Sequence, residues 1–165
     1  MNNTKTDPVG IDLIIQDIQN DLYDKLSVLW GDIKGFGRVY KNKKQERTIP
    51  EYYAGKGEYD EVLTDDMKTA TFFFLESGEL ESKGSCLSKT NVELYFLVDV
   101  SKAKSSIQHY ADEEVRLDVL NIVKNNLTIV RTIKGRDALS SFTVEDLDFI
   151  HPYFIFKIEG IINNY

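Results

Sequence analysis

The last fifteen residues, HPYFIFKIEGIINNY, place the strongest constraint on how this chain folds. Eight of them are large apolar or aromatic residues, whereas chain ends are usually polar and frayed. The His151–Pro152 pair favours an extended entry, because the proline ring disfavours a helical conformation in the residue before it. β-branched and aromatic residues then follow from Tyr153 to Ile162, which predicts a long strand. One face of this strand carries Phe154, Phe156 and Ile158, and the other carries Tyr153, Ile155, Lys157 and Glu159.

Three further segments are predicted as strands. TATFFFLES, residues 69–77, is a short apolar run rich in aromatic residues. VELYFLVDV, residues 92–100, has a mixed second face of Glu93, Tyr95, Leu97 and Asp99, so we expect partial cover there. GFGRVYK, residues 35–41, is a shorter candidate. The apolar face of the 92–100 segment consists of Val92, Leu94, Phe96, Val98 and Val100.

Two segments show helical periodicity. Apolar side chains recur every three or four residues from 9 to 31, which predicts a long amphipathic helix capped by Asp7, with Pro8 at its first position and Gly31 at its end. A second helix is predicted over 111–126, with acidic residues in its first turn, where the helix dipole favours them. The stripes are Ile11, Ile14, Ile15, Ile18, Leu22, Leu26 and Leu29 in the first helix, and Val115, Val119, Ile122 and Val123 in the second, flanked by Leu120 and Leu127.

Two segments near the end of the chain have a less definite secondary-structure prediction. LTIVRTIKG, residues 127–135, either extends the second helix or begins a strand. Thr143 before Glu145 and Asp146 indicates one short helical turn.

The order of these segments predicts an α+β fold, with a mostly antiparallel sheet and two main helices packed on one face. A chain of 165 residues suits a single domain over 1–165. Residues 1–8 are predicted as an N-terminal arm. Residues 41–66 are polar and aromatic, broken by Pro50, Gly55 and Gly57, and too long for a simple loop, so they predict an extended loop or hairpin arm.

Composition excludes several classes of protein. Twenty Lys and Arg against 27 Asp and Glu give a net charge of −7, which argues against a general nucleic-acid binder. The basic segment YKNKKQERT is interpreted as a solvated loop or hairpin tip. The polar start MNNTKTDPVG lacks the apolar core of a signal peptide, and no apolar run is long enough to span a membrane. A single cysteine, Cys86, rules out an intrachain disulfide and fits a cytosolic folding environment.

The candidate catalytic residues lack the spacing that chemistry requires. His109 and His151 are not at a metal-ligand spacing, and Cys86 lies in a polar segment without a nucleophile motif. The glycine pairs GFG (35–37) and GKG (55–57) lack the third glycine or the G-K-[ST] of phosphate-binding loops, so both are interpreted as turn glycines. We therefore expect no catalytic, cofactor-binding or metal-binding residue and no enzymatic activity.

Two alternative functions stay open. A small metal-dependent nuclease would draw on Asp65, Asp66 and Glu93. Against it, FKIEG has its charges in the reverse order of the E-x-K pattern of restriction-type nucleases. A host ligand-binding domain would instead use the face of the sheet as its pocket.

The 41–66 arm carries the candidate interface residues. Tyr52, Tyr53 and Tyr59 are amphipathic anchors of the kind enriched in protein interfaces, although they can equally pack on their own domain. The basic residues of the arm, Lys43, Lys44 and Arg47, complete the candidate set.

The order of segments also carries a resemblance. It runs IDLIIQDIQNDLYDKL, GFGRVYKN, an arm with PEYYAGKGEYDEVLTDD, TATFFFLE, VELYFLVDVSK, ADEEVRLDVLNIVKNN and PYFIFKIEGIINNY. Over most of the chain this resembles small virion proteins of tailed bacteriophages that form rings at the neck or the top of the tail. These are of the tail-terminator or head–tail completion type, and the chain is most similar to those of crAss-like phages of Bacteroides.

The resemblance implies a homo-oligomeric ring in the virion, assembled in the host cytoplasm. Such rings join portal-side and tail-side proteins around a channel through which DNA passes without specific binding. They contact no membrane and have no catalytic residues. A head-to-tail ring also needs two different faces on each subunit.

The assignment of the final strand can be tested by truncation. If residues 153–162 pair within the domain's own sheet, deleting 153–165 removes a core strand, and we expect no soluble, folded protein. Solubility after expression and far-UV circular dichroism check this, and a soluble, folded truncation would show that the strand serves a neighbouring molecule instead.

Overall fold

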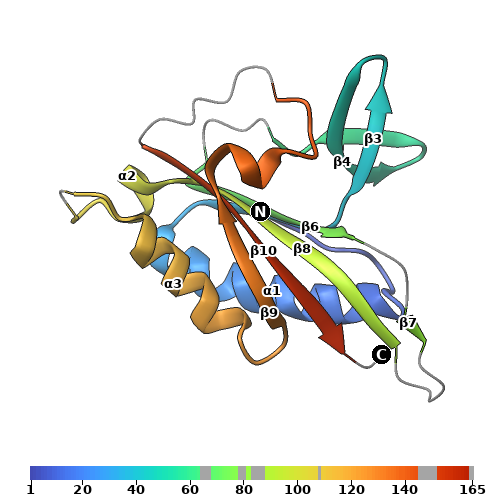
Figure 1. The fold of residues 1–165 in the computed structure, drawn as a ribbon, viewed down its shortest axis with the longest axis horizontal. Coiled ribbons are helices and arrows are strands. Elements are labelled where there is room, and N and C mark those ends of the chain that lie inside the picture. Colours follow the sequence, from blue (N-terminus) through green and yellow to red (C-terminus); the bar gives the residue numbers. More distant parts are fainter. Residues whose placement is uncertain (64–67, 78–80, 83–87, 108, 145–151, 164–165) are drawn as a thin grey trace.

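The computed structural model describes residues 1–63, 68–77, 81–82, 88–107, 109–144 and 152–163. Its architecture is α+β, as the sequence predicts: a seven-stranded, mostly antiparallel sheet carries α1 (Ile11–Trp30) and α3 (Asp112–Val123) on one face (Figure 1). The strands follow the order β1 (Asn2–Asn3), β2 (Ile33–Arg38), β6 (Ala70–Glu76), β8 (Ser88–Asp99), β10 (Tyr153–Asn163) and β9 (Thr128–Lys134), and β7 (Glu81–Ser82) also pairs with β8.

The C-terminal strand lies inside this sheet. β10 pairs antiparallel with β8 from Tyr153 opposite Asp99 to Asn163 opposite Lys89, and its other edge pairs with β9. The predicted strand is therefore confirmed, and its two faces are those expected, with Phe156 and Ile158 in the core beneath the helices and Ile155 on the opposite side. Of the two assignments left open for residues 127–135, the strand is correct.

A ladder of phenylalanines joins the central strands on the helix side. Phe72 of β6 lies opposite Phe96 of β8, which lies opposite Phe156 of β10. The ring centroids are 5.6 Å apart in the first pair and 4.9 Å in the second, and both pairs are stacked. All three side chains are fully buried, so the helix stripes pack against a continuous aromatic surface.

Most of the apolar side chains predicted to be buried in the first helix are buried, and the prediction is wrong at its two ends. Ile15, Ile18, Leu22 and Leu26 are buried, but Leu29 is 53% exposed and Trp30, one turn after Leu26, is buried instead. The N-terminal cap is also different from the prediction, because Gly10 and not Asp7 precedes the first helical residue. Asp7 and Gly10 both adopt positive φ, which reverses the chain between β1 and α1.

The second face of the sheet is covered as well. Tyr95 of β8 stacks on Phe73 of β6, and Phe142 meets both rings edge-on. A short 3₁₀ helix, η1 (Gly135–Leu139), which the sequence analysis missed, adds Ala138 and Leu139 to this second core. The predicted strand at 92–100 also ends one residue early, because Asp99 caps the short helix α2 (Val100–Ala103) and Val100 belongs to that helix.

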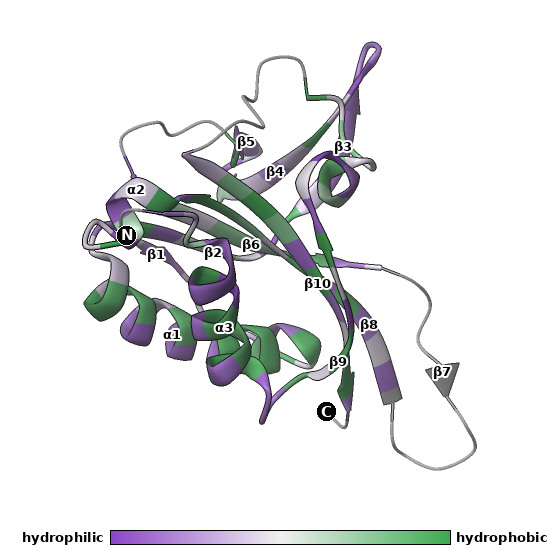
Figure 2. Ribbon diagram, turned by 60° about the vertical axis from the view of Figure 1, so that its left-hand side comes forward, coloured by the Kyte–Doolittle hydropathy of each residue, from purple (hydrophilic) through white to green (hydrophobic). Residues whose placement is uncertain are grey.

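A separate three-stranded antiparallel sheet is formed by residues of the predicted arm. It consists of β3 (Tyr40–Lys44), β4 (Arg47–Gly55) and β5 (Glu58–Glu61), and we call it the small sheet. It projects from the seven-stranded sheet on the side away from α1 and α3, and the tip of its β3–β4 hairpin is hydrophilic (Figures 1 and 2). The basic segment is thus at a hairpin tip, one of the two positions predicted for it.

The small sheet is tied to the segment that carries Phe142 of the second core by hydrogen bonds and by a cation–π contact. The Thr48 N–H donates to Thr143 Oγ1 at 2.9 Å, and the Thr143 N–H donates to the Thr48 carbonyl at 2.7 Å. Lys41 lies over the Phe142 ring. Thr143 therefore holds β4, and the helical turn predicted at Glu145 and Asp146 lies outside the described residues.

The glycine pairs serve different purposes. Gly55 and Gly57 adopt positive φ between β4 and β5 and are turn glycines, as predicted. Gly35 and Gly37 are not, because they lie within β2. A Cβ at Gly35 would come within 2.6 Å of Phe72 Cζ, so the aromatic ladder requires a glycine there.

Gly160 in β10 offers a test of this close packing. A Cβ at that position would lie 2.6 Å from Leu127 Cγ and 2.8 Å from both δ carbons. We expect Gly160→Ala to lower the free energy of unfolding by about 1–3 kcal/mol, and Leu127→Ala to lower it by about 2–5 kcal/mol. Leu127→Ala also removes the clashing atoms. The loss of unfolding free energy in the double variant should therefore be smaller, by at least about 1 kcal/mol, than the sum of the losses in the two single variants. Urea unfolding of the three variants measures this, and strictly additive losses would contradict the close contact.

Candidate functional site: the small sheet and the groove beside it

An exposed aromatic cluster lies on one face of the small sheet. Strand alternation and register put Tyr40, Tyr53 and Tyr59 on this face, since Tyr53 pairs directly with Tyr59. The ring centroids of Tyr53 and Tyr59 are 5.2 Å apart, and Tyr40 meets Tyr59 edge-on at 5.9 Å. The three residues are 43–46% exposed. We call this cluster the tyrosine patch.

The same face holds a buried carboxylate. Glu51 of β4, opposite Tyr40, is 1% exposed and accepts hydrogen bonds from Asn42 Nδ2 at 2.8 Å and from Lys44 Nζ. Burial raises the pKa of Glu51, but the bonds from Lys44 and Asn42 outweigh it, so the pKa lies below its ordinary value. Glu51 thus stays ionised and fixes β3 against β4.

The structure divides the predicted interface residues. Tyr53 and Tyr59 join the exposed patch, whereas Tyr52 points to the other face, packs against Phe36 at 5.3 Å and borders the second core of its own domain. Lys43 and Arg47 are exposed at the hairpin. Tyr40 was not predicted, because its place beside Tyr59 depends on strand register and not on spacing along the chain.

A groove lies beside the tyrosine patch. Its volume is about 410 Å³, within the range usual for ligand sites. One wall is formed by residues 3–6 and the first half of α1, the other by β4 with Tyr40, and the end of β2 lies between them. Tyr40, Tyr53, Asp12, Gln19 and Arg38 are among its lining residues.

The charged residues of this groove form a closed network. Arg38 Nε lies 2.8 Å from Asp12 Oδ1, and Arg38 NH1 lies 2.5 Å from Glu76 Oε2. Lys5 Nζ adds a second cation 2.7 Å from Asp12 Oδ2. Two positive and two negative charges therefore balance one another.

Gln19 on the floor of the groove has an unmatched oxygen. The residue is fully buried, and its Nε2 donates to Asn2 Oδ1 at 2.7 Å and to the Asn3 carbonyl at 2.8 Å. Its Oε1 is the one fully buried side-chain nitrogen or oxygen in the described part of the chain without a hydrogen-bond partner. Gly37 lies against it, at a position where a Cβ would come within 3.0 Å of Oε1.

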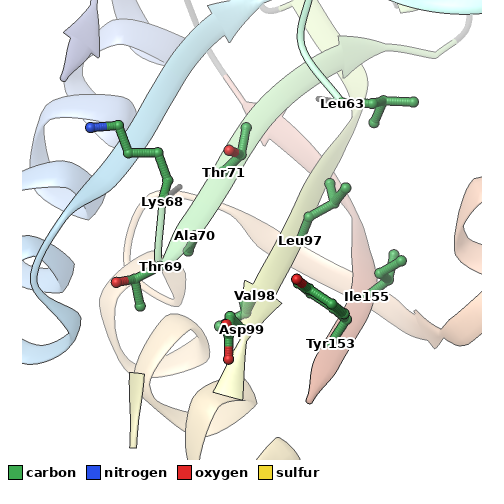
Figure 3. Close-up of a pocket in the computed structure, with 10 residues that line it drawn as sticks. All are labelled: Leu63, Lys68, Thr69, Ala70, Thr71, Leu97, Val98, Asp99, Tyr153 and Ile155. Carbon is green, nitrogen blue, oxygen red and sulfur yellow. The ribbon is translucent and has the colours of Figure 1, made fainter. Parts of the chain in front are cut away.

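A second cavity lies at the start of β10, between Leu97, Ile155 and Leu63 (Figure 3). Its volume is about 40 Å³, which is room for little more than a water molecule. This cavity is too small for the ligand of the alternative hypothesis, but a third cavity of about 300 Å³ lies on the sheet beside Glu93, Arg131 and Glu159. The groove beside the small sheet is larger than either.

The nuclease alternative receives no support from Glu93. Both of its carboxylate oxygens are engaged, Oε1 by Lys157 Nζ at 3.0 Å and Oε2 by the Tyr95 hydroxyl. Burial raises the pKa of the Tyr95 phenol, and the Glu93 carboxylate raises it further, so the phenol remains a donor. No group of three His, Cys, Asp or Glu side chains suited to a metal occurs among the described residues, which exclude Asp65, Asp66, Cys86 and His151. His109 is described and exposed.

No protein-family model matches the chain, and a search of curated proteins returned no similar sequence. Within the ranges described, no helix is long and apolar enough to cross a membrane.

The buried Glu51 predicts an acid-sensitive contact. A carboxylate whose pKa is lowered on folding stabilises the fold above its unfolded pKa, about 4.3, and this stabilisation is lost as pH falls through the folded value. We expect Lys44→Met to lower the free energy of unfolding at pH 7 by about 1 kcal/mol, a modest value because Lys44 is largely exposed.

The matched control is Lys43→Met, an exposed neighbour on the opposite face of β3. Urea unfolding at pH 7 and pH 3 should show a deficit for Lys44→Met that shrinks in acid, and none for Lys43→Met. Equal deficits for both variants, or a deficit independent of pH, would contradict the assignment.

Proposed function

We propose that this protein is a structural subunit of a tailed-bacteriophage virion, which assembles into a ring at the neck or the top of the tail. In this proposal the small sheet contacts the neighbouring subunit, and the ring joins portal-side and tail-side proteins around the DNA channel. The observation that carries the proposal is the tyrosine patch on a sheet that projects from the domain (Figure 1).

The tyrosine patch has the chemistry of an interface centre. Tyrosine is enriched among residues that dominate binding energy, because it buries a large area with few torsions and keeps a hydroxyl for hydrogen bonding. Tyr59 contacts both Tyr40 and Tyr53, so these side chains have less conformational entropy to lose on binding.

A ring needs a second, different surface, and the helix layer supplies a candidate. Val28 is 85% exposed, and Leu13, Leu29 and Leu117 are each about half exposed. These residues belong to α1 and α3, which form the helix layer on one face of the seven-stranded sheet (Figures 1 and 2). Contact between the tyrosine patch of one copy and the helix layer of the next would be heterologous, as a closed ring requires.

The proposal is tested by sedimentation velocity and negative-stain electron microscopy of the full chain over a concentration series. Repeating the runs with portal and tail proteins of the same phage covers assembly that needs those partners. We expect ring-sized particles in one of the two conditions.

Two sets of variants probe the two surfaces. Tyr53→Ser with Tyr59→Ser, and separately Val28→Glu, should weaken association by about thirtyfold or more, the effect of losing an interface hot spot. Tyr110→Ser, between α2 and α3 and 80% exposed, is the matched control and should assemble normally. A wild-type chain that stays monomeric alone and with those partners would refute the proposal.

A further inference from the structure

We propose that the groove between the small sheet and the start of α1 is a binding site for a small, uncharged, hydroxyl-rich ring ligand of the monosaccharide class. The site shares Tyr40 and Tyr53 with the tyrosine patch but is not the same surface, because Tyr59 of the patch does not line the groove and Gln19 of the groove is not in the patch.

Gln19 Oε1 lacks a hydrogen-bond donor. A buried carbonyl-type oxygen without a donor destabilises the fold, and native structures rarely leave one without a reason. Both donor hydrogens of its amide are directed to Asn2 and Asn3, so the amide cannot rotate to satisfy Oε1 without losing those bonds. Gln19 Oε1 lies 3.0 Å from the otherwise open Cβ position of Gly37, so a small shift of the Gln19 side chain would bring Oε1 within reach of a hydroxyl in the groove.

Gly37 leaves space on the floor of the groove. Apart from the Gln19 amide, nothing beyond its immediate chain neighbours lies within 4 Å of where its Cβ would be, and φ is not in the left-handed region. Neither backbone conformation nor core packing therefore demands glycine here, in contrast to Gly35. The absent side chain leaves the floor of the groove open to a ligand that approaches the backbone.

The charge balance selects against a charged ligand. Asp12, Arg38, Lys5 and Glu76 pair with one another, so the network has no net charge with which to attract an anion or a cation. A hydroxyl both donates and accepts, and can add to such a network without displacing a charge.

The two tyrosines of the groove favour a ligand with a saturated six-membered ring. Tyr40 and Tyr53 line the groove, and each is nearly half exposed. A saturated ring presents a face of C–H groups that packs on an aromatic side chain, while its edge hydroxyls reach the polar wall. The volume of about 410 Å³ accommodates one such ring with its shell of hydrogen-bond partners.

The test is titration of the ¹⁵N-labelled full chain with D-glucose, D-galactose, D-mannose and N-acetylglucosamine, followed by ¹H–¹⁵N spectra. At least one sugar should shift the amides of Gly37 and Gly55 and the Gln19 side-chain NH₂ in a saturable manner. Sodium phosphate and the capped dipeptide acetyl-Gly-Gly-amide serve as charged and peptide probes. Saturable shifts of the same signals by either probe, but by no sugar, would overturn the ligand class.

Three variants separate this site from the ring contact. Gly37→Val places a β-branched residue, well tolerated in strands, on the floor of the groove and should weaken sugar binding at least tenfold. Gln19→Met, which keeps the side-chain length but removes the acceptor together with the bonds to Asn2 and Asn3, should do the same. Val28→Glu, near the end of α1 and outside the groove lining, should bind sugar like the wild type even where it impairs assembly. Unchanged binding by Gly37→Val, shifts confined to other regions, or no shift with any sugar would refute the proposal.

Discussion

The aromatic ladder of Phe72, Phe96 and Phe156 is the contact on which the rest of the fold depends. It fixes the register of β6, β8 and β10, because a slip of one residue would turn every phenylalanine to the opposite face. That opposite face carries Phe73, Tyr95 and Lys157 at the adjacent positions, so the same register also builds the second core. Both helices then pack on a surface that is already aligned.

Charged side chains that this register buries are paired with neighbouring side chains of opposite charge. Lys157, 6% exposed, lies 3.0 Å from Glu93 and 3.1 Å from Glu159, two carboxylates that face each other across β8 and β10. The lysine thus offsets a repulsion that the pairing of two glutamates would otherwise create. Glu51 is held in the same way by Lys44 and Asn42 in the small sheet. These residues resemble catalytic carboxylates in type, but their contacts are those of structural ion pairs.

The two proposed activities use different parts of one region. The small sheet offers the tyrosine patch outward, and its inner edge forms one wall of the groove. Tyr40 and Tyr53 belong to both, so assembly and ligand binding could influence each other through these two side chains. In the virion-ring proposal, such coupling means that a ligand bound in the groove would change the affinity of one subunit for the next.

The sequence by itself determined the α+β class, the strands at 69–77 and 153–162 and the stripes of both helices, because apolar periodicity reports directly which face of an element is buried. It grouped Tyr52 with Tyr53 and Tyr59 as interface candidates, whereas the structure packs Tyr52 against the second core. Only the tertiary structure decided that Gly35 makes room for Phe72, that Tyr40 joins Tyr59 and that Gln19 lies beneath a groove. Each of these depends on contacts between segments distant in the sequence, and such contacts exist only once the strands have taken their register and the chain has closed around its cores.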